Sequence, residues 1–471
     1  MKRSSFIVIC SALACQSIMG QKSLSYESAV TSYNNAIQLF DAEMYGAART
    51  AFADFVEEWS DKEEVLVADS KFFEAVSAKK LMNSDAPSLL RSFALSCPQN
   101  IHHHEALYHL GDYYLIKGDE CKALDWFLKA DDKKVPKSIR PELVFKTGYC
   151  YFMDGKHARA LAYFDRLNDN QGRYAGAMKY YRAHVDYEKG NLNEAQKAFF
   201  DLEKDAGFSS VAPYYIAHIC YLQGYYSEAV RYAEPLTKGD SRKSIDMVRI
   251  MADGHFMLAE YGKAITWYEK LISATRTINR ADYYHLGMCY YYEGKYVEAS
   301  QNLSKVTGER DELSQNAYYH LADSYLRLGN KNKARVAFDA ASKSNFDKAI
   351  KEDAHFNKLK LAYELNFAPF NEIITQFVEF IDTYPNSDKI DEAYDFMGKA
   401  FVTTKNYRQA LATMEKIKHK NLRIYTAMQR LAFYRGLELY ENTKFDEAVE
   451  FFDYSLKYGD YDAALKARAY Y

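Results

Sequence analysis

The sequence contains nine near-copies of one short pattern, and these copies recur at an almost constant interval. Each copy ends in an alanine. From one terminal alanine to the next the steps are 37, 35, 34, 35, 35 and 35 residues up to Ala334, then 76 to Ala410 and 38 to Ala448. A period in this range with helical patterning predicts a stack of two-helix hairpins, each burying its apolar face against its neighbours. The copies are Gly118 to Ala123, Gly155 to Ala160, Gly190 to Ala195, Gly224 to Ala229, Ala259 to Ala264, Gly294 to Ala299, Gly329 to Ala334, Lys405 to Ala410 and Thr443 to Ala448.

Each copy lies in a longer frame that predicts two helices. A small residue twelve positions before the terminal alanine would allow the helices to cross closely, and a large apolar residue four positions after the alanine would share its face of the second helix. The glycine that opens most copies can adopt positive φ, which would end the first helix. The small crossing residues are Gly111, Gly148, Ala183, Ala217, Ala252, Gly287, Ala322, Gly398 and Gly436. The large residues include Phe127, Phe164, Phe199, Tyr268, Phe338 and Phe452.

These residues resemble a known family. The segment Leu110-Gly111-Asp112-Tyr113-Tyr114, followed by Gly118, Ala123 and Phe127, is similar to the signature of tetratricopeptide repeats. The resemblance covers most of the chain after residue 25 and implies an all-α fold, a right-handed α-solenoid of about twelve helix-turn-helix units. It implies a scaffold that holds other macromolecules and says little about which partner is held. The stretch from Phe377 to Ser387 resembles the repeat variant of bacterial envelope proteins, including outer-membrane assembly lipoproteins.

The spacing predicts four segments. Residues 1–20 would be a signal peptide, 21–98 divergent repeat units, 99–345 the regular array, and 346–471 a C-terminal array of longer units. The terminal Ala469-Tyr470-Tyr471 stops where a further crossing residue is due. We therefore expect the array to be truncated here and to continue in a longer protein.

The N-terminus predicts export. Lys2 and Arg3 precede an apolar stretch from Phe6 to Ala14 that is too short to span a bilayer, and a cleavage point follows at Gly20. The alternative is lipidation at Cys15, which would anchor a lipoprotein. No other segment is a transmembrane candidate. We expect an exported protein, in the periplasm or at the outer membrane of a Gram-negative bacterium.

Composition and motifs exclude several functions. The net charge is −3 with dispersed cations, so nucleic acid is not expected as a partner. The segment from His104 to His109 has one residue too many for a zinc-protease motif, whose ligands share a helix face. We expect no enzyme activity and no catalytic, cofactor-binding or metal-binding residues. Cys150, Cys220 and Cys289 are predicted to be buried free thiols.

The first helices carry many of the 42 tyrosines. In the family that the repeats resemble, these helices line a concave groove, and aromatic residues occur here three before and four after the crossing residue. Tyrosine offers a large contact area and a polar tip, which suits a bound peptide. The alternative is that the rings only pack between adjacent units. The predicted groove residues are Tyr108, Tyr180, Tyr187, Tyr214, Tyr221, Tyr284, Tyr291 and Tyr319.

The sequence therefore predicts a non-enzymatic scaffold of the cell envelope that binds partner proteins or peptides through a tyrosine-rich groove. One alternative is an outer-membrane nutrient receptor lipoprotein that binds glycans. Such receptors need long insertions between units, and the even spacing leaves no room for them. The other alternative is an accessory domain whose catalytic part lies in another chain.

Overall fold

The computed structural model describes residues 26–61, 64–167, 172–239, 241–403, 407–417, 420–458 and 460–471. These residues form helices and turns, with one isolated bridge between Thr307 and Glu309 and no β-strand. The chain divides into two compact units, residues 1–212 and 213–471, each of which is described by itself. The predicted signal peptide and the alternative lipidation site at Cys15 lie outside the described residues.

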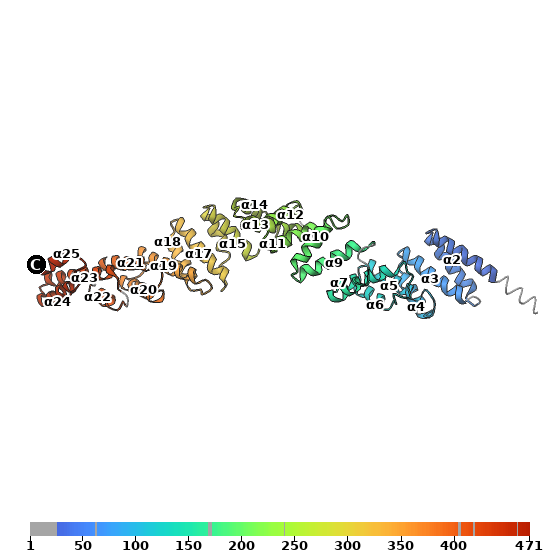
Figure 1. The fold of residues 1–471 in the computed structure, drawn as a ribbon, viewed down its shortest axis with the longest axis horizontal. Coiled ribbons are helices and arrows are strands. Elements are labelled where there is room, and N and C mark those ends of the chain that lie inside the picture. Colours follow the sequence, from blue (N-terminus) through green and yellow to red (C-terminus); the bar gives the residue numbers. More distant parts are fainter. Residues whose placement is uncertain are drawn as a thin grey trace, which may run out of the picture. The chain divides into compact units, whose positions relative to one another are not determined.

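In the first unit the helices form consecutive pairs, and a short turn joins the two helices of each pair (Figure 1). A first helix over residues 26–41 packs against α2, and each later pair consists of an odd-numbered first helix and an even-numbered second helix. The labelled helices are α2 (Tyr45–Trp59), α3 (Glu64–Lys80), α4 (Ala86–Ser96), α5 (His103–Ile116), α6 (Glu120–Phe127), α7 (Arg140–Met153), α8 (His157–Phe164), α9 (Ala175–Glu188) and α10 (Leu192–Leu202).

The second unit continues the same alternation of first and second helices. Its helices are α11 (Ala212–Leu222), α12 (Tyr226–Ala233), the short 3-10 helix η1 (Glu234–Leu236), α13 (Arg242–Met257), α14 (Tyr261–Ala274), α15 (Arg280–Tyr292), α16 (Tyr296–Leu303), α17 (Glu312–Arg327), α18 (Lys331–Ser342), α19 (Lys348–Glu364), α20 (Phe370–Thr383), α21 (Ile390–Thr403), α22 (Tyr407–Glu415), α23 (Leu422–Glu441), α24 (Phe445–Lys457) and α25 (Ala463–Tyr470). The described helices make twelve pairs followed by α25, which confirms the predicted α-solenoid of repeat units.

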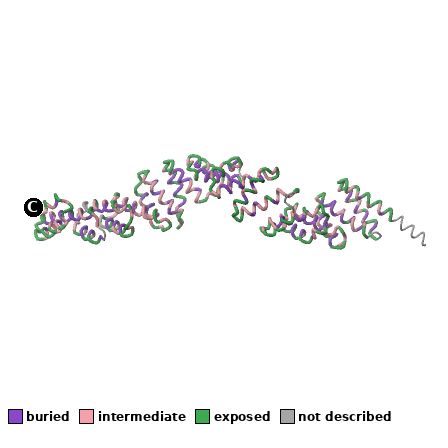
Figure 2. The backbone as a smooth tube through the Cα atoms, viewed as in Figure 1, coloured by how far each residue is buried: buried purple, intermediate pink, exposed green. Residues whose placement is uncertain are grey.

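The crossing residues Gly111 and Gly148 lie where the sequence predicts them, whereas a Cβ atom added to the predicted crossing residue Gly398 would meet nothing within 4 Å. A Cβ atom added to Gly111 would lie 2.6 Å from the ring of Phe127, and one added to Gly148 would lie 2.6 Å from the ring of Phe164. Both rings are essentially inaccessible to solvent. The small residue of the first helix therefore makes room for the large residue of the second helix. Buried residues concentrate between paired helices, while turns are exposed (Figure 2).

The turns between paired helices confirm the predicted backbone conformation. Gly118, Gly155, Gly190, Gly224, Gly294 and Gly329 all have φ between 70° and 80°. Three copies open with another residue. Lys405 lies outside the described residues, and Ala259 and Thr443 adopt the same conformation, each with φ of 58°. A side chain with a Cβ is strained in this region, so the repeat geometry imposes the conformation on these residues.

We expect Ala259→Gly to stabilise the second unit by about 0.5–1 kcal/mol, because relief of the left-handed strain exceeds the entropy that glycine loses on folding. Urea denaturation followed by circular dichroism measures the change. Ala340→Gly, in the last turn of α18, is the matched control and should instead lower stability, by up to about 1 kcal/mol. A destabilised Ala259→Gly variant would show that this turn is not strained.

The remaining fold-level expectations concern the cysteines and the membrane. Cys150, Cys220 and Cys289 are buried free thiols, as predicted. Burial raises the pKa of the Cys150 and Cys289 thiols to about 12, so both remain protonated at neutral pH. Among the described residues, none of the helices combines the length and hydropathy that a membrane crossing requires.

Candidate functional site: the first-helix face

Successive first helices contact one another within each unit. In the first unit α3 contacts α5, and in the second unit α13 contacts α15, α15 contacts α17 and α17 contacts α19. Each unit therefore has a face built only from first helices, which we call the first-helix face. The eight tyrosines predicted from the sequence all belong to these helices.

In the second unit, four of the predicted tyrosines connect adjacent first helices. Each donates its hydroxyl hydrogen to an aspartate that lies 32 or 34 residues further along the chain. The pairs are Tyr214 with Asp246 at 3.2 Å, Tyr221 with Asp253 at 3.2 Å, Tyr291 with Asp323 at 2.6 Å and Tyr319 with Asp353 at 2.8 Å. The recurrence of one bond at one repeat interval makes a ladder of Tyr–Asp bonds.

The electrostatics of the ladder keep these tyrosines as hydrogen-bond donors. Burial and then the bonded aspartate raise the pKa of Tyr319, and the same two causes raise that of Tyr291. Burial and then the charge of Tyr292 raise the pKa of Tyr284 to about 12. The phenols are protonated at neutral pH. The second unit contains five of the eight predicted groove tyrosines. In four of these five, the hydroxyl group already donates a hydrogen bond to the next first helix.

The three predicted tyrosines of the first unit also pack against neighbouring rings. Tyr108 is only 4% exposed and stacks on Phe127, with the ring centroids 6.1 Å apart. Tyr180 stacks on Phe208 at 5.2 Å, and Tyr187 makes an edge contact with His184 at 6.5 Å. Tyr108 and Phe127 lie on the two helices of one pair, and Tyr187 and His184 lie on one helix, so these two contacts do not join successive first helices. A role of the eight tyrosines in partner binding stays a prediction.

A second set of first-helix residues forms a row of exposed, large apolar side chains. These residues lie five positions after the crossing residue, in the last turn of the first helix or directly after it, and each is between 50% and 57% exposed. They are Ile116 and Met153 in the first unit and Leu222, Met257 and Tyr292 in the second. We call these residues the exposed apolar row.

The row is unusual because it repeats. Single exposed apolar side chains are common on soluble proteins, whereas contiguous apolar strips mark interaction surfaces. Leu222, Met257 and Tyr292 occupy one position on three successive first helices of the second unit. Arg327 occupies the corresponding position on the next first helix, α17, and its Nε lies 3.4 Å from Asp323. The apolar strip of the second unit therefore ends at a charged residue.

Sequence reasoning missed the exposed apolar row by one residue. It placed the groove residues three positions before and four positions after the crossing residue, and at the second of these positions Tyr221 and Tyr291 are half-buried. Adjacent residues of a helix diverge by about 100°, so only one of the two positions can face solvent fully. The sequence does contain a sign of this row. A large apolar residue recurs five positions after the crossing residue in five repeats, where an exposed helix surface would usually carry a polar residue.

Beneath the first-helix face of the first unit lies a chain of buried charges. Asp112 on α5 accepts hydrogen bonds from the ammonium groups of Lys79 on α3 and Lys146 on α7. Lys146 also donates to Oε1 of Glu142 at 2.5 Å. Burial acts to raise the pKa of the Asp112 carboxyl, but the charges of Lys79 and Lys146 outweigh it and hold that pKa below its usual value. These pairs connect three successive first helices.

Two family models match parts of the sequence that form these helix pairs. The model described as "Tetratricopeptide repeat" matches residues 142–171, and the model described as "Anaphase-promoting complex, cyclosome, subunit 3" matches residues 257–341. The chain contains tetratricopeptide repeats. The tetratricopeptide repeat model covers most of α7 and α8 in the first unit, and the other model covers the helices from α14 to α18 in the second unit.

Several solved structures are similar to this chain. A tetratricopeptide repeat protein from Parabacteroides merdae is 18% identical, with 54% of this chain and 98% of that chain covered and a TM-score of 0.33. The C-terminal part of a repeat-containing protein from Cytophaga hutchinsonii is 18% identical, with 60% and 98% covered and a TM-score of 0.32. The Cut9–Hcn1 hetero-tetramer of the anaphase-promoting complex matches at 11% identity, with 92% and 95% covered and a TM-score of 0.27. A comparison with curated protein sequences found no match.

Proposed function

We propose that this protein is a non-enzymatic scaffold of a bacterial cell envelope, and that it holds partner proteins on its first-helix faces. The tetratricopeptide fold is in general an interaction scaffold. The observation that carries the proposal is the exposed apolar row, because it places large apolar side chains at one position on successive helices. The envelope location rests on the N-terminal sequence, where two cations precede a short apolar stretch.

The row and the tyrosine ladder have different roles in this proposal. The ladder holds adjacent first helices together, since its hydroxyl groups bind aspartates of the next helix. The row lies beside the ladder and is free to be covered by a partner. Methionine and leucine suit such a surface because their side chains adapt their shape to different partners.

We expect the double substitution Leu222→Glu and Met257→Glu to reduce partner binding by about tenfold or more, because two buried charges would replace the apolar anchors of the interface. The substituted residues are exposed, so helicity and the unfolding midpoint should stay close to those of the parent. The readout is the set of proteins that the purified chain retains from envelope extract, quantified by mass spectrometry.

The matched control replaces exposed apolar residues of second helices in the same unit. Val297 on α16 and Val336 on α18 are as exposed as the row, so Val297→Glu with Val336→Glu makes the same change in charge outside the first-helix face. The control should retain the same proteins as the parent. If both double variants lose them equally, or if neither does, the row is not the binding surface.

A further inference from the structure

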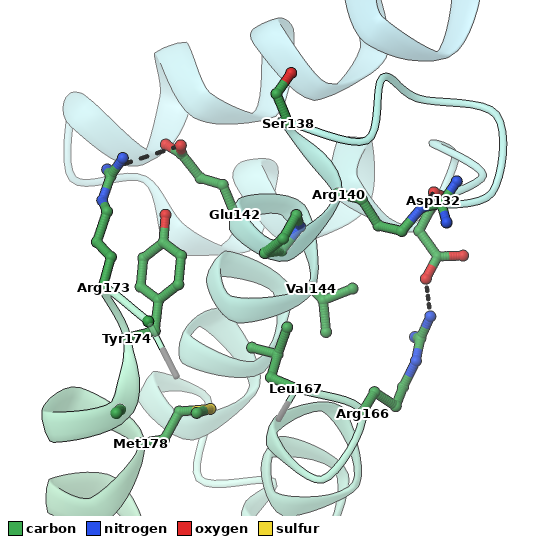
Figure 3. A pocket seen from close by; sticks show the side chains of 13 residues that line it. Asp132, Ser138, Arg140, Glu142, Val144, Arg166, Leu167, Arg173, Tyr174 and Met178 are labelled. Atoms are coloured by element: carbon green, nitrogen blue, oxygen red, sulfur yellow. Dashed lines mark hydrogen bonds and ion pairs between the residues drawn. The ribbon is translucent and has the colours of Figure 1, made fainter. Parts of the chain in front are cut away.

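A cavity of about 560 Å³ lies in the first unit, away from the exposed apolar row. Its described lining comes from the loop between α6 and α7, the start of α7, Arg166 and Leu167 after α8, and the segment from Gly172 to Met178 that leads into α9. Figure 3 shows two ion pairs on opposite sides of the cavity, Arg173 with Glu142 and Arg166 with Asp132. The cavity is thus charged at its rim, and its size falls within the usual range for ligand pockets.

The floor between the two ion pairs is apolar and already packed. Val144 and Met178 are buried, and Leu167 is half-buried beside them (Figure 3). The ring of Tyr174 is fixed, because it stacks on Phe145 with a centroid distance of 4.4 Å and an interplanar angle of 19°. These residues give the cavity an apolar floor that a large apolar side chain of a ligand can contact.

On one side of the rim, Arg140 keeps an uncompensated positive charge. Its Nε donates to the backbone oxygen of Asp132 at 2.6 Å and its Nη2 to that of Lys133 at 3.0 Å. These acceptors are neutral, and they fix the position of the guanidinium group. The carboxylate of Asp132 is paired with Arg166. The exposed Lys133 and Lys137 in the same loop add further positive charge.

On the other side, Arg173 is only weakly held. Its Nη2 lies 3.7 Å from Oε2 of Glu142, and its side chain is 74% exposed. Glu142 has a closer partner in Lys146, at 2.5 Å. Burial acts to raise the pKa of Glu142, but the bond to Lys146 and its charge outweigh burial and lower it. Glu142 is therefore ionised and satisfied without Arg173, which remains available to another anion.

We propose that this cavity binds an acidic segment of a partner protein, with a large apolar side chain on the floor and carboxylates on both sides of it, directed toward Arg140 and Arg173. The inference rests on the proposed scaffold function and gives the chemistry of a second contact with a partner. Complementary charge favours the acidic segment over a basic one, because the carboxylates of the rim are already paired. The apolar floor favours a peptide over a small inorganic anion.

Direct binding of synthetic peptides to the full-length chain tests the proposal. The probe is a fluorescent peptide of sequence Gly-Glu-Glu-Phe-Glu-Glu-Gly, and its fluorescence anisotropy is measured. One comparison peptide has lysine for each glutamate, and the other has glycine for the phenylalanine. We expect each comparison peptide to bind at least about tenfold more weakly. Raising the ionic strength from about 0.05 M to about 0.5 M should weaken the binding of the acidic peptide, because salt screens the exposed charges of the rim.

Arg173→Glu locates the binding within the cavity. This substitution should lower the affinity for the acidic peptide by about tenfold or more, because it removes one attractive charge and adds one repulsive charge. Arg310→Glu, an exposed arginine in a loop of the second unit, makes the same change in charge and should leave binding unchanged. Circular dichroism verifies that both variants are folded.

Equal binding of the acidic and lysine peptides, or unchanged binding to Arg173→Glu, would overturn the proposal. The Leu222→Glu and Met257→Glu variant separates this result from the function proposed above. It should bind the acidic peptide like the parent, because the cavity is formed by other residues. If the peptide fails to bind while the parent still retains partners that this variant loses, the cavity proposal fails and the scaffold function stands.

Discussion

Asp112→Ala is expected to lower the free energy of unfolding of the first unit by about 3–5 kcal/mol, because it leaves the buried ammonium group of Lys79 without its carboxylate. Asp112 is 4% exposed, and it is the shared acceptor of Lys79 and Lys146 from the two neighbouring first helices. Amide hydrogen exchange in α3, α5 and α7 measures the loss locally. The largest loss of protection should fall on these three helices.

A double variant provides the control. Asp112→Leu with Lys79→Met replaces the most buried pair by apolar side chains, while Lys146 keeps its bond to Glu142. Much of the lost stability should return, since apolar groups of similar volume often replace a buried pair without loss. A single Asp112→Ala variant as stable as the parent would show that these charges do not hold the first helices together.

The ion pairs of Asp112 also predict how the free energy of unfolding depends on pH. The pKa of Asp112 in the folded chain lies below its usual value, because the charges of Lys79 and Lys146 outweigh the effect of burial. A depressed pKa stabilises the folded state above the unfolded value of about 3.9, and this contribution is lost as pH falls through the folded value. The stability difference between the parent and Asp112→Ala should therefore be constant near neutral pH and shrink below about pH 4.

Phe127→Ala is expected to cost about 3–5 kcal/mol, because it opens a cavity at a helix crossing that has little freedom to collapse. The ring of Phe127 fills the space beside Gly111, where a Cβ atom would lie 2.6 Å from it, and it stacks on Tyr108. Since each repeat unit is stabilised mainly by its neighbours, the loss should reach α7 and α8 as well as α5 and α6. Amide hydrogen exchange in these four helices measures how large the loss of stability is and how far it extends along the chain.

Leu128→Ala is the matched control for this prediction. Leu128 directly follows Phe127, is also a large apolar residue, and is half exposed. Its truncation should change stability by less than about 0.5 kcal/mol. Equal losses from the two variants would mean that Phe127 is not the residue that packs at the crossing.

Much of the fold could be predicted from the sequence, because the repeat encodes its own packing. The small residue at Gly111, the turn at Gly118 and the ring at Phe127 each have one role in a two-helix unit, and the structure confirms all three. The same logic covers the degenerate pair α3 and α4, which carries little of the signature and still forms a helix hairpin. Neighbouring units provide the packing that its own sequence specifies only weakly.

The exposed apolar row was harder to predict for a physical reason. Sequence periodicity shows that Tyr291 and Tyr292 both lie near the end of one helix, but the contact with the next first helix decides which ring is covered. In the structure Tyr291 reaches Asp323, and Tyr292 stays exposed. Such contacts depend on how adjacent units pack, which a single repeat does not encode.

The cavity of the first unit gave no signal in the sequence. Its arginines, Arg140, Arg166 and Arg173, come from three separate segments next to loops, where no periodicity relates one position to another. The packing of α7 against α8, and of Phe145 on α7 against Tyr174 and Tyr181, brings these segments together. A site formed by loops between repeats is therefore found from the structure and not from the repeat pattern of the sequence.

Site-specific photo-cross-linking in the cells that produce this protein tests most directly whether partners are held on the first-helix face. A photoreactive phenylalanine analogue replaces Met257 in one variant and Val297 in another, since the two residues are equally exposed and lie on a first and a second helix. The account predicts discrete adducts of higher mass with partner proteins at position 257 and none at position 297. Adducts at 297 alone, or the same adducts at both positions, would contradict it.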